Sequence, residues 1–368
     1  MKSININYED LKIAKEQFKT QTARNLQRIK SKKNKHFNIA WNDSLTLVIA
    51  QGCKNNCRSC SRTFAGNSRM DPQLFNHMLD YASRHFHSVS VTGGEPVEHF
   101  DVIAEYAKNY PDLRINITTS AESIDQEIIG SLKTTPNIFL LISLNGIGEI
   151  HDKSRYDGSF EKTYESIQKL ITHRIPFGII TVINQSNIYQ ILSGELAEFV
   201  NKIGACTFEL FQYYPIGNNE SNFRKLMLQG KQIDEAIEYR NNLFANNPYD
   251  FLFKAAQLPS KRCHREVQIN VDGSVSYCPF SIWGFEKVYT SDSEDMMLEK
   301  INRHLDKWNE LTAKSPSFCP LQSNTADYID FFEKNGNKHS ASSGILDKTS
   351  NTFEAYCSEA KKAKVHGE

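Results

Sequence analysis

Charge of neither sign prevails in this chain. Lysine and arginine together number 43, and so do aspartate and glutamate, which makes the formal net charge zero at pH 7. A balanced chain gives no support to a polyanionic partner, because nucleic acid is bound through an excess of basic residues. We therefore do not expect a nucleic-acid function.

Long apolar runs are also missing. No stretch approaches the roughly 20 apolar residues that a helix needs to cross a bilayer. The N-terminal stretch MKSININYEDLKIAKEQ has no apolar segment of the signal-peptide type. The sequence therefore predicts a soluble, cytoplasmic protein without a membrane partner.

Cysteine is scarce, with eight residues in a chain of 368. This is too few for a disulfide scaffold. Three of the cysteines nevertheless lie close together in GCKNNCRSC, as Cys53, Cys57 and Cys60. In a reducing compartment such a group indicates metal or redox chemistry. Structural zinc sites are closed by four protein ligands, so three thiolates leave one coordination position for another molecule.

Apolar runs of β-forming residues recur from residue 45 onward, with segments of helix length between them. They are LTLVIA, SVSVTG, RINITT, IFLLISL, FGIITVI and CTFELFQYY. Strands of this nearly continuous apolar kind predict a parallel sheet covered by helices. The expected fold class is therefore α/β, a partial (β/α)6 TIM-like barrel over residues 45–217.

The pattern changes on either side of this barrel. Residues 218–335 predict a small C-terminal α+β domain, in which EVQINVDGSVSYC indicates a β-hairpin that turns at Asp272 and Gly273. Residues 1–44 predict a basic lead-in, helical from residue 7 to residue 35. Residues 336–368 are polar and predict a loop followed by a C-terminal helix.

Two motifs follow the first two predicted strands. The cysteine loop comes after the first strand, and VTGGEP ends the second. In parallel βα architectures ligands gather at the carboxyl ends of the strands. Gly93 and Gly94 lack side chains, so the backbone can approach a ligand closely there.

This order of motifs resembles the radical S-adenosylmethionine (SAM) superfamily, from residue 45 to about residue 215. In that family three cysteines hold a 4Fe-4S cluster whose open iron binds SAM, and reduction yields a 5'-deoxyadenosyl radical that abstracts hydrogen. The resemblance implies that Cys53, Cys57 and Cys60 are the cluster ligands. It also implies an electron donor of the flavodoxin or ferredoxin type. The alternative for the triplet is a zinc site or a structural thiol cluster.

The resemblance further implies which residues contact SAM. The loop that contacts the amino group contains Gly93, Gly94, Glu95 and Pro96, and Ser143 and Asn145 in ISLNG lie near the headgroup and the ribose. Arg155 in HDKSRYDGSF pairs with the carboxylate, and Tyr214 and Pro215 in YYPIGN lie beside the adenine. Ser59 departs from the pattern, because the family usually has an aromatic residue before the third cysteine. The alternative for Ser143, Asn145 and Arg155 is that they are ordinary polar residues at strand ends.

A second group of cysteines lies in the C-terminal part of the chain, as Cys263, Cys278, Cys319 and Cys357. The hairpin flanked by the first two resembles the opening of the extension called SPASM, or twitch in its shorter form, which holds auxiliary clusters. The further cysteine run of full SPASM domains is absent from this sequence, so we expect one auxiliary 4Fe-4S cluster at most. Unligated thiols are the alternative, and His264 or the substrate could replace Cys357 as fourth ligand. Cys206 is expected to be a small core residue.

Three functions remain open at this point. The first is a radical SAM enzyme that modifies a ribosomally made peptide or protein by cross-linking, oxidation or epimerisation. The second is a dehydrogenase or dehydratase for a small molecule such as a sugar or cyclitol, and the third a non-enzymatic zinc or iron-sulfur module. For an oxidative reaction Glu209 is the candidate base, with a barrel ion pair as its alternative role.

Overall fold

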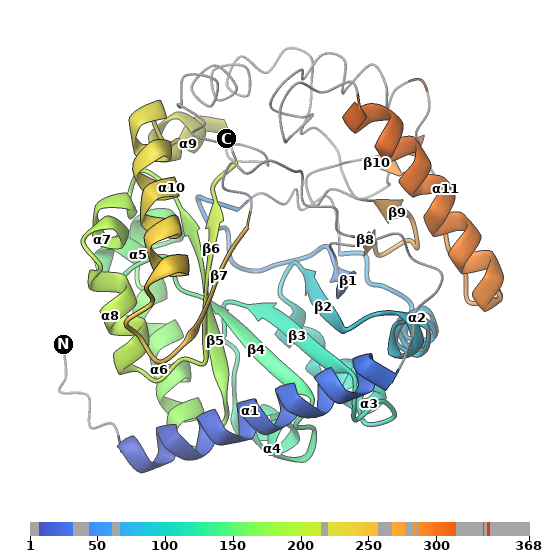
Figure 1. The fold of residues 1–368 in the computed structure, drawn as a ribbon, viewed down its shortest axis with the longest axis horizontal. Helices are drawn as coiled ribbons and strands as arrows, with labels where there is room; N and C mark the ends of the chain where they lie inside the picture. The colour runs from blue at the N-terminus through green and yellow to red at the C-terminus, as the bar shows by residue number, and fades with distance from the viewer. Residues whose placement is uncertain are drawn as a thin grey trace.

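Parallel strands form where the six apolar runs predict them, in a computed structural model of the chain (Figure 1). The structure describes residues 7–31, 44–60, 67–214, 220–256, 267–276, 283–284, 286–313, 334 and 337–338. The six strands are β1 (Ser44–Ala50), β2 (Ser88–Gly93), β3 (Arg114–Thr119), β4 (Ile138–Ser143), β5 (Phe177–Ile183) and β6 (Thr207–Gln212). Each pairs in parallel with the next along the chain, so the predicted partial barrel is confirmed.

The sheet continues beyond these six strands at both edges. Strand β7 (Leu252–Ala256) pairs in parallel with β6, and β8 (Val267–Ile269) pairs in parallel with β1. Strand β9 (Val275–Ser276) returns antiparallel to β8 around Gly273, whose φ of 85° suits the predicted turn. The hairpin expected in the C-terminal domain is therefore part of the barrel sheet. Two further short strands, β10 (Trp283–Gly284) and β11 (Asn337–Lys338), pair with each other.

Helices cover the outer face of the curved sheet (Figure 1). The helices that follow β1 in the described residues are α2 (Pro72–His85), the 3-10 helix η1 (Pro96–His99), α3 (Phe100–Ala107), α4 (Gln126–Thr134), α5 (Glu149–Ser154), α6 (Ser159–Thr172), α7 (Ile188–Leu192), α8 (Glu195–Lys202), α9 (Glu220–Leu226), α10 (Gly230–Ala245) and α11 (Glu294–Ala313). Alternate strand residues such as Val89, Val91, Ile115 and Ile117 are fully buried in the same apolar cluster as the helices. The residues between them therefore face the concave side.

The concave side is more polar and more open than the outer side. Ser90, Asn116, Thr118 and Ser143 alternate with fully buried neighbours, and each is only partly buried. Ile180 is also partly buried there, beside a small apolar cluster. The concave side is therefore lined in part by polar, partly exposed side chains, unlike the packed apolar core of a closed TIM barrel.

Helix α1 (Tyr8–Ser31) crosses the end of the barrel opposite the carboxyl ends of the strands (Figure 1). Phe18 of α1 lies 4.9 Å from the ring of Phe139 in β4. The guanidinium of Arg114 lies over both rings, at 4.6 Å and 4.2 Å from their centroids. The predicted lead-in helix therefore buries one face against the barrel through aromatic and cation–π contacts.

Helix α11 is joined to the barrel through α2. The Glu294 carboxylate lies 2.6 Å from Nε2 of His85 and 2.8 Å from Nε of Arg84. His77 also contacts the backbone oxygen of Asp292, at 3.0 Å.

Across the part of the chain that the structure describes, no helix is both long and apolar enough to traverse a bilayer.

Candidate functional site

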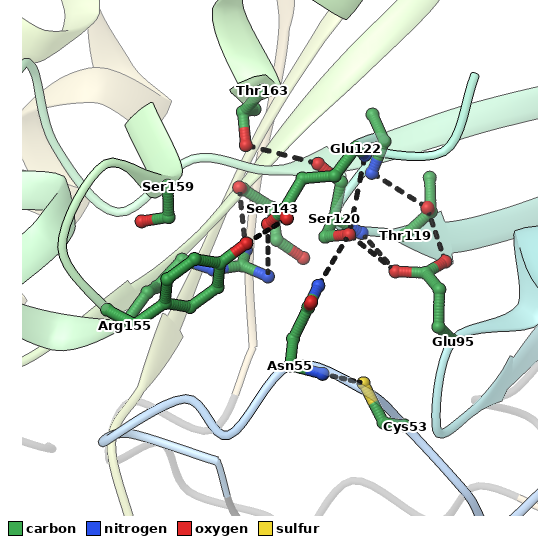
Figure 2. A network of polar contacts seen from close by, with 12 residues as sticks. Cys53, Asn55, Glu95, Thr119, Ser120, Glu122, Ser143, Arg155, Ser159 and Thr163 are labelled. Carbon is green, nitrogen blue, oxygen red and sulfur yellow. Dashed lines mark hydrogen bonds and ion pairs between the residues drawn. The ribbon is translucent and has the colours of Figure 1, made fainter. Parts of the chain in front are cut away.

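The three predicted cluster ligands lie on the loop that leaves the carboxyl end of β1. Cys53, Cys57 and Cys60 are free thiols and are half-buried. The backbone N–H of Asn55 donates to Sγ of Cys53 at 3.4 Å (Figure 2). The sequence thus predicts the position of this loop at the ligand-binding edge of the sheet, and the structure places it there.

The protein environment disfavours charge on these thiols as long as no cation balances it. The pKa of Cys53 is raised to about 12, mainly by burial, with smaller contributions from the nearby Glu95, Cys57 and Cys60. Burial also raises the pKa of Cys57, although Arg155 opposes this. A cationic iron cluster reverses that preference, because thiolates are the ligands that iron-sulfur clusters bind. The three thiols therefore fit a cluster that takes one thiolate at each of three corners.

Among the residues for which side chains are described, no three His, Cys, Asp or Glu side chains are grouped as a single metal ion requires.

The second half of the cysteine loop is fixed to the segment between α5 and α6. The N–H of Arg58 donates to the backbone oxygen of Arg155 at 3.0 Å, and the N–H of Ser59 to that of Ser154 at 2.9 Å. The Arg58 side chain adds an ion pair with Asp157 at 3.0 Å. These bonds place Arg155 beside the thiols of the cysteine loop.

The Gly-Gly-Glu-Pro loop contacts the first half of the cysteine loop. The N–H of Gly94 donates to the Ala50 oxygen at 2.8 Å. A Cβ at Gly94 would lie 1.7 Å from the Gly52 oxygen, so only glycine allows this approach. Gly93 has a φ of 146°, which L side chains rarely adopt, and Pro96 begins η1. The two motifs are therefore held together by backbone contact.

The Glu95 carboxylate is buried and fully engaged within the protein. Oε1 accepts from Oγ1 of Thr119 at 2.5 Å and from the N–H of Val97 at 3.2 Å. Oε2 accepts from the N–H and the hydroxyl of Ser120, at 2.9 Å and 2.6 Å. Ser120 in turn accepts from the Asn55 side chain at 3.2 Å (Figure 2). Glu95 thus ties the ends of β2 and β3 to the cysteine loop, and its predicted contact with SAM stays a prediction.

Arg155 and Ser143 are brought together as the sequence predicts. Nη1 of Arg155 donates to the backbone oxygen of Ser143 at 3.0 Å. Burial opposes the charged guanidinium, but the neighbouring Cys57 and Glu122 outweigh it and raise the pKa of Arg155. The segment is shaped by Asp152, whose carboxylate accepts from the N–H groups of Gly158 and Phe160, both at 2.8 Å. Arg155 therefore remains cationic beside the cysteine loop.

Asn145 lies in the loop after β4, and its hydrogen bonds join this loop to neighbouring elements. Its side-chain oxygen accepts from the N–H of Val182 at 2.9 Å, and its own N–H donates to Nδ1 of His151 at 3.0 Å. Its backbone oxygen accepts from the Asn187 side chain at 2.8 Å. These bonds tie the ends of β4 and β5 together. Its predicted contact with the SAM headgroup stays a prediction.

We expect His151 to make stability depend on pH. Burial and the Arg155 charge lower the pKa of His151 from 6.5 to about 3. Between these values the unfolded chain binds a proton that the folded protein does not, so stability falls as the pH drops below 6.5. At pH 5 this amounts to about 2 kcal/mol. The substitution His151→Asn keeps an acceptor at the Nδ1 position for Asn145. It should remove most of the difference in unfolding free energy between pH 7.5 and pH 5, measured by denaturant titration; an unchanged difference contradicts the prediction.

The predicted adenine-flanking residues lie after β6. Tyr214 is buried, whereas Pro215 lies outside the described residues. The preceding Tyr213 is also buried, and burial together with the nearby Cys60 raises the pKa of its hydroxyl. Tyr213 therefore lies near the cysteine loop.

Glu209 lies on the concave face of β6 and is almost fully buried. Its carboxylate accepts from Nζ of Lys254 in β7 at 3.0 Å, in the register that pairs these two residues. This is the barrel ion pair named as its alternative role. Its role as a base stays a prediction.

Cys263, Cys278, Cys319 and Cys357 all lie outside the described residues. Cys206 is buried beside Phe18 and Phe139, as a core residue should be.

Sequence reasoning missed several polar residues of the site. Ser120 and Glu122 follow β3, Asn55 lies between the first two cysteines, and Tyr156 follows Arg155 (Figure 2). The available signal was position, because each lies at the carboxyl end of a predicted strand or inside a motif already singled out. Their residue types alone are common in such loops.

Comparison with known proteins agrees with this site. Residues 47–191 match the family model described as the radical SAM superfamily. The AdoMet-dependent heme synthase of Methanosarcina barkeri is 29% identical over 50% of this chain and 52% of its own length. A cysteine-type anaerobic sulfatase-maturating enzyme of Clostridium novyi is 32% identical over 26% of this chain and 28% of its own. The chain thus spans about half the length, or less, of these curated relatives.

Solved structures share the fold at low sequence identity. SuiB of Streptococcus suis bound to its precursor peptide SuiA has a TM-score of 0.58 at 15% identity, covering 71% of this chain and 65% of SuiB. The enzyme anSMEcpe with bound AdoMet has a TM-score of 0.58 at 16% identity, covering 79% and 96%. The family match lies on the strands and loops that build the site. Residues 47–191 are thus a radical SAM domain, and the relatives and solved structures that this chain resembles are enzymes.

Proposed function

We propose that this protein cleaves SAM at a 4Fe-4S cluster held by Cys53, Cys57 and Cys60, and uses the resulting radical to modify a peptide or protein. The observation that carries the SAM chemistry is the convergence of the cysteine loop, the Gly-Gly-Glu-Pro loop and Arg155 at one end of the barrel. The cluster, when bound, supplies the electron that breaks the carbon–sulfur bond of SAM. The electron itself comes, in this proposal, from a flavodoxin or ferredoxin.

The residues of this chain bind and orient the reactants. The backbone at Gly93 and Gly94 offers polar groups to the amino group of SAM, without side chains in the way. Arg155 offers a guanidinium fork to its carboxylate. Glu95 and Ser120 keep these loops in register with the thiols.

The substrate is proposed to enter the concave side of the barrel. Ser90, Asn116 and Thr118 give this side polar groups, while Ile180 and Val182 give it apolar ones, and all are partly exposed. Such a lining suits a peptide segment, which presents amide groups together with a side chain. Two solved proteins that share this fold, SuiB and anSMEcpe, were determined with bound peptides. An acidic leader contacting the basic lead-in at Lys30, Lys32, Lys33 and Lys35 is part of the same proposal.

A small-molecule substrate is the second candidate. It is favoured by the heme synthase of Methanosarcina barkeri, which matches half of this chain. An oxidative reaction on either substrate needs a base, proposed to be Glu209, and an acceptor of an electron. The proposed auxiliary cluster at Cys263, Cys278 and Cys319 would serve as that acceptor.

Deuterium transfer tests the proposal. We expect the reconstituted protein, given SAM, dithionite and a library of fully deuterated short peptides, to release deuterium-labelled 5'-deoxyadenosine and a peptide of altered mass. Mass spectrometry detects both, and the variant lacking the three cysteines serves as the control. Label arriving from a deuterated porphyrin precursor, and not from the peptide, would instead support the small-molecule candidate.

A further inference from the structure

Arg155 keeps hydrogen-bond donors uncommitted although its side chain is only 8% exposed. Nη1 donates to the Ser143 oxygen at 3.0 Å, and the guanidinium also bonds to the Cys57 thiol. Within the described part of the chain, Nε has no hydrogen-bond partner. A guanidinium carries five N–H groups, so a further anion can still be bound.

Glu122 is the carboxylate that faces this guanidinium. Its side chain is likewise only 8% exposed, and Oε1 lies 4.0 Å from Nη2 of Arg155. That separation allows Coulomb attraction but lies beyond hydrogen-bond distance. Oε1 has no hydrogen-bond partner among the residues that the structure covers. The two opposite charges are therefore buried together without a direct hydrogen bond between them.

Tyr156 holds Glu122 in this position. Its hydroxyl donates a hydrogen bond to Oε2 of Glu122. Backbone geometry also contributes, because Ala121 has a φ of 65°, which non-glycine residues adopt rarely. The N–H of Ala121 donates to Oγ1 of Thr119 at 2.8 Å, and that of Glu122 to Oγ of Ser120 at 3.4 Å. The loop after β3 thus directs the carboxylate toward Tyr156.

A buried guanidinium that binds a ligand needs both a counter-charge and unoccupied donors. A buried charge requires a counter-charge. A carboxylate that closed on Arg155 in a bidentate pair would, however, occupy the donors that an incoming carboxylate needs. The Glu122 carboxylate, restrained with Oε1 4.0 Å from Nη2 of Arg155, provides the counter-charge and leaves the donors of the guanidinium available.

We propose that Tyr156 restrains Glu122 away from Arg155, so that the guanidinium is stabilised in the free enzyme yet remains available to the carboxylate of SAM. Tyr156 and Glu122 are then positioning residues that act through Arg155. The inference rests on the assignment of Arg155 to the SAM carboxylate in the proposed function.

Removing the restraint should weaken SAM binding. In Tyr156→Phe the Glu122 carboxylate is free to close on Arg155 and compete with SAM, so we expect the Kd for SAM to rise about tenfold, the value of one charge-assisted hydrogen bond. In Tyr156→Phe combined with Glu122→Gln the competing charge is gone, and the Kd should return to about that of Glu122→Gln alone. Anaerobic calorimetric titration of the reconstituted protein measures all four Kd values, and visible absorption verifies the cluster.

Two controls separate this mechanism from general damage. Decarboxylated SAM lacks the carboxylate, so its Kd should not change in Tyr156→Phe. Tyr189 is 69% exposed, and Tyr189→Phe should bind SAM as the wild type does. A double variant that binds SAM as weakly as Tyr156→Phe, or an equal loss for decarboxylated SAM, would overturn the inference.

Arg155→Gln tests the underlying assignment separately. It should weaken SAM binding and leave decarboxylated SAM unaffected. If it affects neither, the assignment of Arg155 is wrong, and the inference is wrong with it. If it affects SAM alone while Tyr156→Phe changes nothing, only the inference about Tyr156 and Glu122 is overturned.

Discussion

The triple variant Cys53→Ala, Cys57→Ala and Cys60→Ala should lose about four irons per chain, the content of one cubane, together with all cleavage of SAM. The three thiols supply every protein ligand that the proposed cluster has, and alanine offers no replacement donor. Their burial also disfavours thiolates without a cation, as the raised pKa of Cys53 shows. Loss of the cluster should therefore be complete.

Iron and sulfide analysis after anaerobic reconstitution, with chromatographic assay of 5'-deoxyadenosine, measures this result. The matched control is Cys206→Ala, because Cys206 is a buried thiol in the apolar cluster with Phe18 and Phe139. It should keep the iron content of the wild type. About eight irons in the wild type and four in the triple variant would support one auxiliary cluster, whereas four and none would remove it. Unchanged iron in the triple variant would contradict the assignment of these ligands.

The sequence predicts the central strands well, for a physical reason. Strands such as β4 are buried on their helix side and flanked by polar, turn-forming residues, so that composition alone marks their limits. The Asp272–Gly273 hairpin was found by its turn residues in the same way. What the sequence does not predict is that β8 pairs with β1, about 220 residues earlier in the chain. Pairing partners depend on long-range contacts that local patterns do not encode.

The same distinction between local patterns and long-range contacts applies to the site. Cys53, Gly94 and Arg155 were identified from motifs, and the structure brings their loops together. Glu122 and Tyr156 were missed because their importance depends on where a buried neighbour lies, which only the fold determines. The sequence predicts Glu95 as a ligand contact, and in the structure its carboxylate forms hydrogen bonds that hold the ends of β2 and β3 together.

The substitution Gly94→Ala should reduce SAM cleavage about 100-fold or more, the cost expected when reacting groups are displaced by about 1 Å. Its Cβ would lie 1.7 Å from the oxygen and 2.3 Å from the carbonyl carbon of Gly52. Both are backbone atoms, so no side chain can rotate away, and the two loops must separate. The hydrogen bond from Gly94 to Ala50, now 2.8 Å, should be lost as well.

The matched control is Gly130→Ala in α4, where a new Cβ would meet no atom of the described residues within 4 Å. Alanine there should stabilise the helix by up to about 1 kcal/mol and leave catalysis unchanged. Rates of 5'-deoxyadenosine formation, SAM affinity and iron content should be measured for both variants. If Gly94→Ala retains wild-type SAM affinity and rate, the two loops do not need this backbone contact. A loss in Gly94→Ala alone would instead show that SAM chemistry depends on how closely the Gly-Gly-Glu-Pro loop approaches the cysteine loop, because both substitutions add the same methyl group.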